Sequence, residues 1–207
     1  TTDSWEFWIG LFQKYIEKTN SLLIEGAFKT EDYALGNWVM AQRQRKKNGS
    51  LNEQRIEKLN SIGFIWDVAE LGWQDGIKHF KEFCESNTTY IVPQKHICDD
   101  GFTLGSWCNS RRGEYRDNLM KQSKIDELNN IGFIFDVDEY KWITEFESLK
   151  IFKQKYGHTN VTEVYDRKNK VRLGKWCGHQ RTAKKNNKLS LDRIEKLDKL
   201  GFIWNLR

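Results

Sequence analysis

Proline is almost absent from this 207-residue sequence, in which Pro93 is the single example. Because proline interrupts helices, its scarcity in a chain with 30% charged residues favours a helical protein in water. The sequence has no run of about 18 apolar residues, which excludes a transmembrane helix. We also expect no signal peptide, since Thr1 to Ser4 lead directly into the first helical pattern.

Cysteine is also sparse, and the sequence contains no CxxC pair. The four cysteines are Cys84, Cys98, Cys108 and Cys177. His96 and Cys98 lie close together but lack the second ligand pair that a zinc site needs, so we expect no metal site. We expect four reduced structural thiols in an intracellular, reducing compartment, either the cytoplasm in association with the nucleoid or the nucleus.

Motifs for nucleotide hydrolysis and for catalysis are missing as well. The phosphate-binding loop GxxxxGK[ST] does not occur, and Gly174-Lys175 follows Arg172-Leu173 where that loop would be rich in glycine. No Ser/His/Asp or Cys/His arrangement recurs, and Asp99-Asp100 before Gly101 is typical of a turn. We therefore expect neither enzymatic activity nor a cofactor.

The sequence does contain a threefold repeat. A Leu-Gly-x-Trp segment recurs every 69 residues and begins at Leu35, Leu104 and Leu173. Each copy continues without a gap to a matching Gly-Phe-Ile end, and these stretches are 35–66, 104–135 and 173–204. We therefore expect an array of three modules of one design. Modules one, two and three are residues 1–66, 67–135 and 136–207.

The spacing of apolar residues predicts an amphipathic helix at the start of each module. Its apolar stripes are Trp5, Ile9, Phe12 and Tyr15, then Trp73, Ile77, Phe80 and Phe83, then Trp142, Phe146, Leu149 and Phe152. A short β-prone segment is expected next, at Leu22–Ile24, Tyr90–Val92 and Val161. Irregular loops should follow, around Gly26, Asp99–Gly101 and Asp166–Lys170.

Two further helices complete each predicted module. The second should begin at Leu35, Leu104 and Leu173 and end at Asn48, Asp117 and Asn186. Asn52 and Ser190 are candidate N-caps for the third helix, and module two offers only Lys121 there. A left-handed C-cap is expected at Gly63, Gly132 and Gly201. Acidic links, Asp67–Gly72 and Asp136–Lys141, should join the modules into a semi-rigid string.

This pattern resembles the helicase-associated domain family, through the opening Trp, the LGxW segment, a Gln-Arg pair and the ending I-x-x-L-x-x-[IL]-G-F-x-W. Gln42-Arg43 and Gln180-Arg181 match the pair, whereas module two has Arg111-Arg112 and ends in Phe135 rather than Trp. The resemblance implies an all-α chain of tandem three-helix modules with Myb-like, helix-turn-helix-like packing. It also implies binding to nucleic acid, in particular DNA, often beside a helicase core.

Basic residues recur in the second helix after the same Trp in every module, as expected of a helix that contacts phosphates. The candidate nucleic-acid-binding residues are Arg43, Lys46, Lys47, Arg111, Arg112, Arg116, Lys175, Arg181, Lys184, Lys185 and Lys188. The alternative is a solvated helix whose basic end complements the helix dipole. At the invariant position Arg43, Arg112 and Arg181, phosphate contact and a scaffold role remain open. The expected scaffold partners are Glu57, Asp126 and Glu195.

The outward face of the second helix varies between modules while its core face stays fixed. The varying positions are 37, 40, 41 and 44 and their counterparts. If this helix enters a major groove, Gln44 and Asn109 could bind adenine and Lys175 could bind guanine. The modules also differ in charge: module one is +1, module two −3 and module three +7. Module three should therefore dominate binding to a polyanion.

These observations favour a double-stranded-DNA-binding array that targets a larger helicase-like protein, without contact with a membrane. A protein-interaction module that docks a helicase core, in the same or another chain, is the first alternative. Binding of RNA or single-stranded DNA, with bases stacked on aromatic side chains, is the second.

Overall fold

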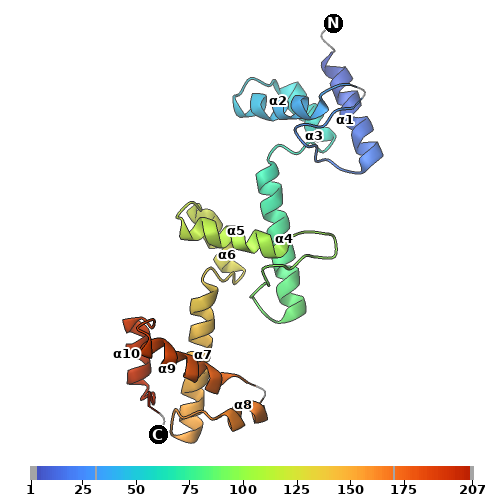
Figure 1. The fold of residues 1–207 in the computed structure, drawn as a ribbon. Coiled ribbons are helices and arrows are strands. Elements are labelled where there is room, and N and C mark those ends of the chain that lie inside the picture. The colour runs from blue at the N-terminus through green and yellow to red at the C-terminus, as the bar shows by residue number, and fades with distance from the viewer. Residues whose placement is uncertain (1–3, 31, 170, 206–207) are drawn as a thin grey trace. The chain divides into compact units, whose positions relative to one another are not determined.

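The computed structural model describes residues 4–30, 32–169 and 171–205, and in these residues it is all-α, as expected (Figure 1). Its ten described helices comprise four in the first part of the chain and six after it. The first four are α1 (Trp5–Thr19), α2 (Leu35–Lys47), α3 (Glu53–Ser61) and α4 (Val68–Asn87). The others are α5 (Leu104–Arg116), α6 (Gln122–Asn130), α7 (Val137–Tyr156), α8 (Glu163–Asn169), α9 (Leu173–Lys185) and α10 (Leu191–Lys199).

The chain divides into two compact units, Thr1–Cys108 and Asn109–Arg207, with the division inside α5. In the first unit α1 packs against α2 around Phe12, Leu35 and Val39, which are fully buried. In the second unit α9 packs against α7 and α8, around a core that includes Leu149 and Cys177. Each unit thus buries the apolar stripes that the sequence predicts.

The second helix of each module has the predicted bounds, and its inward residue is an apolar packing position. Val39, Cys108 and Cys177 occupy the same place in the repeat and are all fully buried. Burial raises the pKa of the Cys177 thiol to about 12, so this group stays protonated at neutral pH. The four described cysteines are free thiols.

The third helix of each module ends as the glycines predict. Gly63, Gly132 and Gly201 have φ angles of 75°, 73° and 69°, in the left-handed region that favours glycine. The next residue, for example Phe64, donates its backbone N–H to the carbonyl of the residue five positions earlier, at 3.0 Å. This is the Schellman pattern, and it buries the phenylalanine under the helix end. At the other end, Asn52 and Ser190 are the N-caps that were expected.

Two local expectations are wrong in the described residues. The β-prone segments form no strand, because none of them pairs with a neighbouring strand. Instead, the side chains of Ile24, Val92 and Val161 are buried. Residues 166–169 are not a loop but the last turn of α8, while Lys170 lies outside the described residues.

The acidic links are a third correction, because they are helical. Asp67 is the N-cap of α4 and accepts a hydrogen bond from the backbone N–H of Glu70 at 2.9 Å. Asp136 does the same for α7, from Glu139 at 2.8 Å. An Asp at the N-cap followed three residues later by a Glu is a helix-start signature. The residues predicted as links are therefore the N-caps and first turns of α4 and α7.

Candidate nucleic-acid interface

The Leu-Gly-x-Trp segment is built into the core of each module. A Cβ added at Gly36 would lie 2.1 Å from the carbonyl oxygen of Glu25, and one at Gly105 would lie 2.3 Å from that of Gln94. Only glycine allows the loop to approach the second helix so closely. In module three the contact is looser and comes from a side chain, because Asp166 accepts hydrogen bonds from the backbone N–H groups at positions 174 and 175.

The tryptophan of the same segment packs against the opening tryptophan of its module. The ring centroids are 6.5 Å apart for Trp5–Trp38, 5.8 Å for Trp73–Trp107 and 5.9 Å for Trp142–Trp176. The ring planes are tilted by 52°, 58° and 57°, so the same tryptophan pair packs in the same way within each module. The leucine, glycine and tryptophan of the recurring motif therefore specify the fold.

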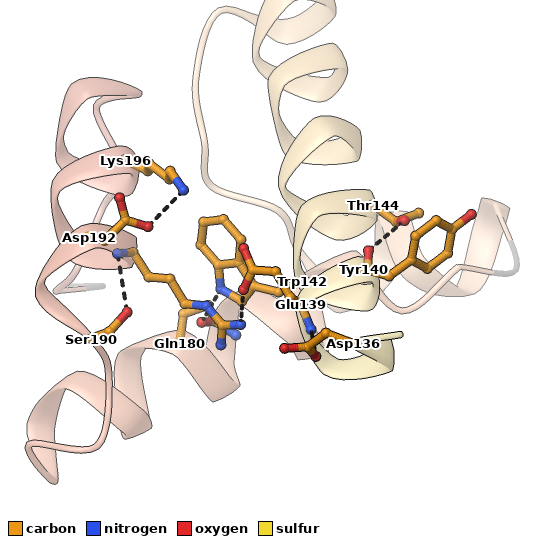
Figure 2. A network of polar contacts seen from close by, with 10 residues as sticks. Asp136, Glu139, Tyr140, Trp142, Thr144, Gln180, Ser190, Asp192 and Lys196 are labelled. Carbon is orange, nitrogen blue, oxygen red and sulfur yellow. Dashed lines mark hydrogen bonds and ion pairs between the residues drawn. The ribbon is translucent and has the colours of Figure 1, made fainter. Parts of the chain in front are cut away.

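The glutamine of the Gln-Arg pair is also structural. Gln180 is buried and accepts a hydrogen bond from the indole nitrogen of Trp142 at 3.0 Å (Figure 2). Gln42, its counterpart in module one, is fully buried. Over Trp142 lies the guanidinium of Arg193, 5.0 Å from the ring centroid, which also forms an ion pair with Glu139. This network joins α7, α9 and α10 (Figure 2).

The invariant arginine of the second helix makes the same two contacts in all three modules. Its Nε donates a hydrogen bond to a main-chain carbonyl, which pairs Arg43 with Ile65 (2.9 Å), Arg112 with Ile134 (2.9 Å) and Arg181 with Ile203 (2.8 Å). Its guanidinium carbon lies over the phenylalanine of the Schellman cap, 5.0–5.5 Å from the ring centroid. Burial lowers the pKa of Arg43 and of Arg181, although both stay charged.

These contacts favour a scaffold role, with a different partner from the expected one. The carboxylate of Glu195 pairs with Lys199 at 2.6 Å, and Asp126 accepts a hydrogen bond from Gln122. The arginine instead secures the chain directly behind the Schellman cap, where the module ends. A carbonyl partner is invisible to a search for opposite charges, which is why the sequence suggested the acidic position.

Two further predicted phosphate contacts, both lysines, also lie over aromatic rings. The ammonium nitrogen of Lys46 is 4.2 Å from the centroid of the Trp66 ring. Lys184 occupies the same repeat position in module three and has the same arrangement. In module two this position is Tyr115, whose ring stacks on Phe135 at 4.1 Å with the planes 28° apart. The lysine and the terminal tryptophan thus change together, as a packing pair does.

In module two the three candidate arginines contact partners within the protein. Arg111 stands where the other modules have a buried glutamine, and it pairs with Glu114 at 2.5 Å. Arg116 is exposed and lies 3.7 Å from Asp117. Since Arg112 is held by the carbonyl of Ile134, each of the three candidates in module two has a contact within the protein.

Module three differs from module two, because its outward helix face borders an open groove. In module one a groove of about 790 Å³ borders the outward residues Met40 and Gln44. The groove of module three has a volume of about 830 Å³ and lies between α9, α8 and the segment before α9. Its lining along α9 includes the four varying positions of the outward face, Lys175, Gly178, His179 and Thr182, together with Gly174 and Arg181. A Cβ added at Gly178 would meet no atom within 4 Å, so this wall is open to a ligand.

Cations gather around this groove, which Asp166 of α8 also lines. Arg167 from α8 and Arg172 from the N-terminal end of α9 line it together with Lys175, and all three are exposed. Among the described residues none of these three has a carboxylate oxygen within 4.0 Å of its charged nitrogens, and the same holds for Lys185 and Lys188. Sequence reasoning missed Arg167 and Arg172 as site residues, because they precede the repeat motif and their relation to α9 depends on the folding of α8.

A model of the helicase associated domain matches residues 2–67, 70–136 and 139–205. The chain belongs to the helicase associated domain family. Its three tandem repeats are those that the 69-residue spacing predicts, and members of this family are accessory modules of helicases. Searches of curated proteins and of solved structures return no match. None of the described helices of this helicase associated array has both the length and the apolar composition that crossing a bilayer requires.

Proposed function

We propose that this helicase associated array binds double-stranded DNA and targets a larger helicase-like protein to it, within the nucleoid or the nucleus. The observation that carries the proposal is the basic groove of module three. Arg167, Arg172 and Lys175, which have no carboxylate partner within the part of the chain that the structure describes, line one concave surface beside an outward helix face that varies between modules. Cations that hold phosphates beside a helix that faces base edges are the usual division of labour at a DNA interface.

Charge supports the assignment of the main contacts to module three. This module has 17 basic and 10 acidic residues, whereas module two has 8 and 11. The free cations of module three add to a local positive potential, which draws a polyanion and releases its counterions on binding. No catalytic role is assigned to any residue of the array.

The exposure of aromatic side chains favours a duplex over single strands. Proteins that bind single-stranded nucleic acid stack bases on exposed aromatic rings. Among the described residues no Trp and no Phe is exposed, because these side chains pack in or against the module cores. Four described tyrosines are exposed, Tyr90, Tyr115, Tyr140 and Tyr156. Of these, Tyr115 is stacked on Phe135 and Tyr156 packs against Phe152.

A salt titration tests the proposal. Fluorescence anisotropy would follow the binding of the 207-residue chain to a labelled duplex, to its single strands and to RNA of the same sequence. We expect the duplex to bind most tightly. The logarithm of its association constant should fall linearly with the logarithm of salt concentration, by about 0.9 per phosphate neutralised. Salt-independent binding, or no binding at low salt, would support the docking of a protein partner instead.

A matched pair of variants locates the interface. Arg172→Gln with Lys175→Gln removes two positive charges from the groove. Lys196→Gln with Lys199→Gln removes two from α10 of the same module, where both lysines sit in exposed ion pairs that contribute little to stability. The groove variant should lose most of the affinity and reduce the salt slope by about 2. Equal losses in the two variants would place the interface elsewhere.

A further inference from the structure

Module two contains a cluster of three potential metal ligands that comes from two separated parts of the chain. His79 lies on α4, while Cys98 and Asp100 lie in the loop before α5. The histidine nitrogen, the cysteine sulfur and a carboxylate oxygen all lie within 4.8 Å of one another. The closest pair is His79 Nε2 and Asp100 Oδ2, at 2.9 Å. Sequence reasoning compared Cys98 with the neighbouring His96, whereas the fold brings it to a histidine 19 positions earlier.

The loop holds its two ligands in place through its own backbone. The backbone N–H of Cys98 donates to the carbonyl of Phe102 at 2.9 Å, and that of Gly101 donates to the carbonyl of Cys98 at 2.9 Å. Asp100 Oδ1 accepts a hydrogen bond from the backbone N–H of Phe102 at 3.0 Å. With Oδ1 engaged, the second oxygen of Asp100 remains to face His79.

The histidine is oriented as metal-ligating histidines are. Its Nδ1 lies 2.7 Å from the carbonyl oxygen of Asp75, an acceptor, so the ring proton belongs on Nδ1. The ring is stacked on Phe102, with centroids 4.4 Å apart and planes 2° apart, and only 11% of the side chain is exposed. Nε2 therefore faces the carboxylate of Asp100, and a separation of 2.9 Å between them needs either a proton on Nε2 or a metal ion. A carbonyl that fixes the other ring nitrogen is the usual outer partner of a ligating histidine.

We propose that His79, Cys98 and Asp100 bind one Zn²⁺ ion. A mixed set of imidazole, thiolate and carboxylate ligands suits zinc better than magnesium or calcium, which prefer oxygen alone. Zinc bonds of about 2.0–2.3 Å in a tetrahedron put ligand atoms about 3.4 Å apart, a separation that small side-chain shifts provide here. The adjoining hollow of about 430 Å³, which Glu82 also lines, has space for a fourth ligand or a water molecule.

The ion would fasten the loop that supports the second helix of module two. The same loop supplies the carbonyls of Pro93 and Gln94, which approach Gly105 in the Leu-Gly-x-Trp segment. Zinc would thus link α4 to that segment. The site is specific to module two, because the positions aligned with His79 in α1 and α7 are Leu11 and Ser148. It would also offset part of the negative charge of this module, the only one of the three with more acidic than basic residues.

Cobalt titration of the 207-residue chain tests the site. After dialysis against a chelator, Co²⁺ would be added and the absorption spectrum recorded. We expect one equivalent to bind with a thiolate-to-cobalt charge-transfer band in the near ultraviolet, and Zn²⁺ to displace it. Cys98→Ser should abolish the band, and Cys84→Ser, which changes a thiol outside the cluster, should retain it. Loss of a direct ligand should weaken binding at least about tenfold, the lower limit for changes in outer-shell partners.

Thermal unfolding supplies a second readout and checks that the variants fold. Zn²⁺ should raise the melting midpoint of the unaltered chain and of Cys84→Ser, because a ligand that binds only the folded state stabilises it. It should leave the midpoints of Cys98→Ser and Asp100→Asn unchanged, while circular dichroism shows all variants to be helical. The proposal is overturned if the unaltered chain binds no Co²⁺, or if Cys98→Ser binds it as tightly.

Discussion

The ammonium nitrogen of Lys184 lies 3.8 Å from the centroid of the Trp204 indole ring, and the same indole donates its N–H to Asp198 at 2.6 Å. A cation on one face and a carboxylate at the edge fix the terminal tryptophan of module three in one orientation. Lys184 is half-buried, whereas its neighbour Lys185 is exposed. The two adjacent lysines therefore have separable roles, one in packing and one in charge.

The first prediction separates these two roles. Lys184→Ala should lower the free energy of unfolding by about 0.5–1 kcal/mol through loss of the cation–π contact, and Lys184→Arg should retain most of it. Lys185→Ala should change stability by less than about 0.5 kcal/mol. Denaturant midpoints measured on the three variants would check this. Equal midpoints for the two alanine variants would contradict a packing role for Lys184.

The invariant arginine gives the second prediction. Arg181→Ala removes a charged donor from the carbonyl of Ile203 and the cover from the Phe202 ring, so it should destabilise module three by about 1.5–3 kcal/mol. Lys188→Ala, which removes an exposed charge of the same helix end, serves as control. Urea unfolding of both variants is the measurement. A stable Arg181→Ala variant with weakened DNA binding would instead identify this arginine as a phosphate contact.

Two glycines of α5 provide the third prediction. Gly105→Ala should be strongly destabilising, because its Cβ would lie 2.3 Å from a carbonyl oxygen that belongs to the backbone and cannot move aside. Gly113→Ala adds a Cβ whose closest neighbour, at 3.8 Å, is the mobile end of Arg116. This second change should stabilise the helix by about 0.5–1 kcal/mol. Opposite shifts of the melting midpoint are expected, and shifts of the same sign would refute the close loop approach.

Acidity should affect module three through Glu145. Burial, and then repulsion from Asp166, raise the pKa of this carboxyl group above its ordinary value. A raised pKa means that the folded state holds the proton more tightly than the unfolded state. The group therefore favours folding below its ordinary pKa of about 4.3 and opposes it at neutral pH, once the raised pKa is passed.

The fourth prediction follows from that sign. Glu145→Gln should raise the melting midpoint at pH 7, and the advantage over the unaltered chain should shrink as the pH falls through the raised pKa and be gone below about 4. Glu147→Gln, two positions along α7 in an exposed ion pair with Lys150, is the control and should show no such gain. A gain that does not change with pH would mean that charge is not its cause.

The fifth prediction ranks the modules by their contribution to DNA binding. Lys185→Gln with Lys188→Gln removes two charges from module three, and Arg116→Gln with Lys121→Gln removes two from module two. The first pair should reduce the affinity for duplex DNA more, because it lies in the module of charge +7. Anisotropy titrations at one salt concentration would measure both. Equal or reversed losses would end the assignment of the main contacts to module three.

The sequence predicts the helices best where the local chemistry is decisive. Gly63 followed by Phe64 predicts the Schellman cap that is found. The polar residues at Asn48 correctly predict the end of the second helix. The starts of α4 and α7 were missed, although the spacing from Asp67 to Glu70 contains the signal. An apolar stripe predicts the part of a helix that is buried. It does not predict exposed helical turns that precede the stripe at the N-terminal end.

The candidate site was less predictable, because it depends on contacts between distant residues. Counting charges identified module three, but Arg172 and Arg167 joined the site only through the folding of α8 beside α9. The same reasoning could not show that Lys46 lies over a ring or that Arg43 is paired with a carbonyl. Composition records which charges exist, whereas packing decides which of them are free.

The hydrogen-bond acceptor of the glycine in the Leu-Gly-x-Trp segment affects how each module tolerates mutation. In modules one and two, Gly36 and Gly105 donate their backbone N–H groups to the carbonyls of Phe28 and His96, which every amino acid possesses. Gly174 of module three donates instead to the carboxylate of Asp166. A single nucleotide change can erase that acceptor but cannot erase the other two. The module with the most positive charge is therefore also the one that mutation can most readily loosen.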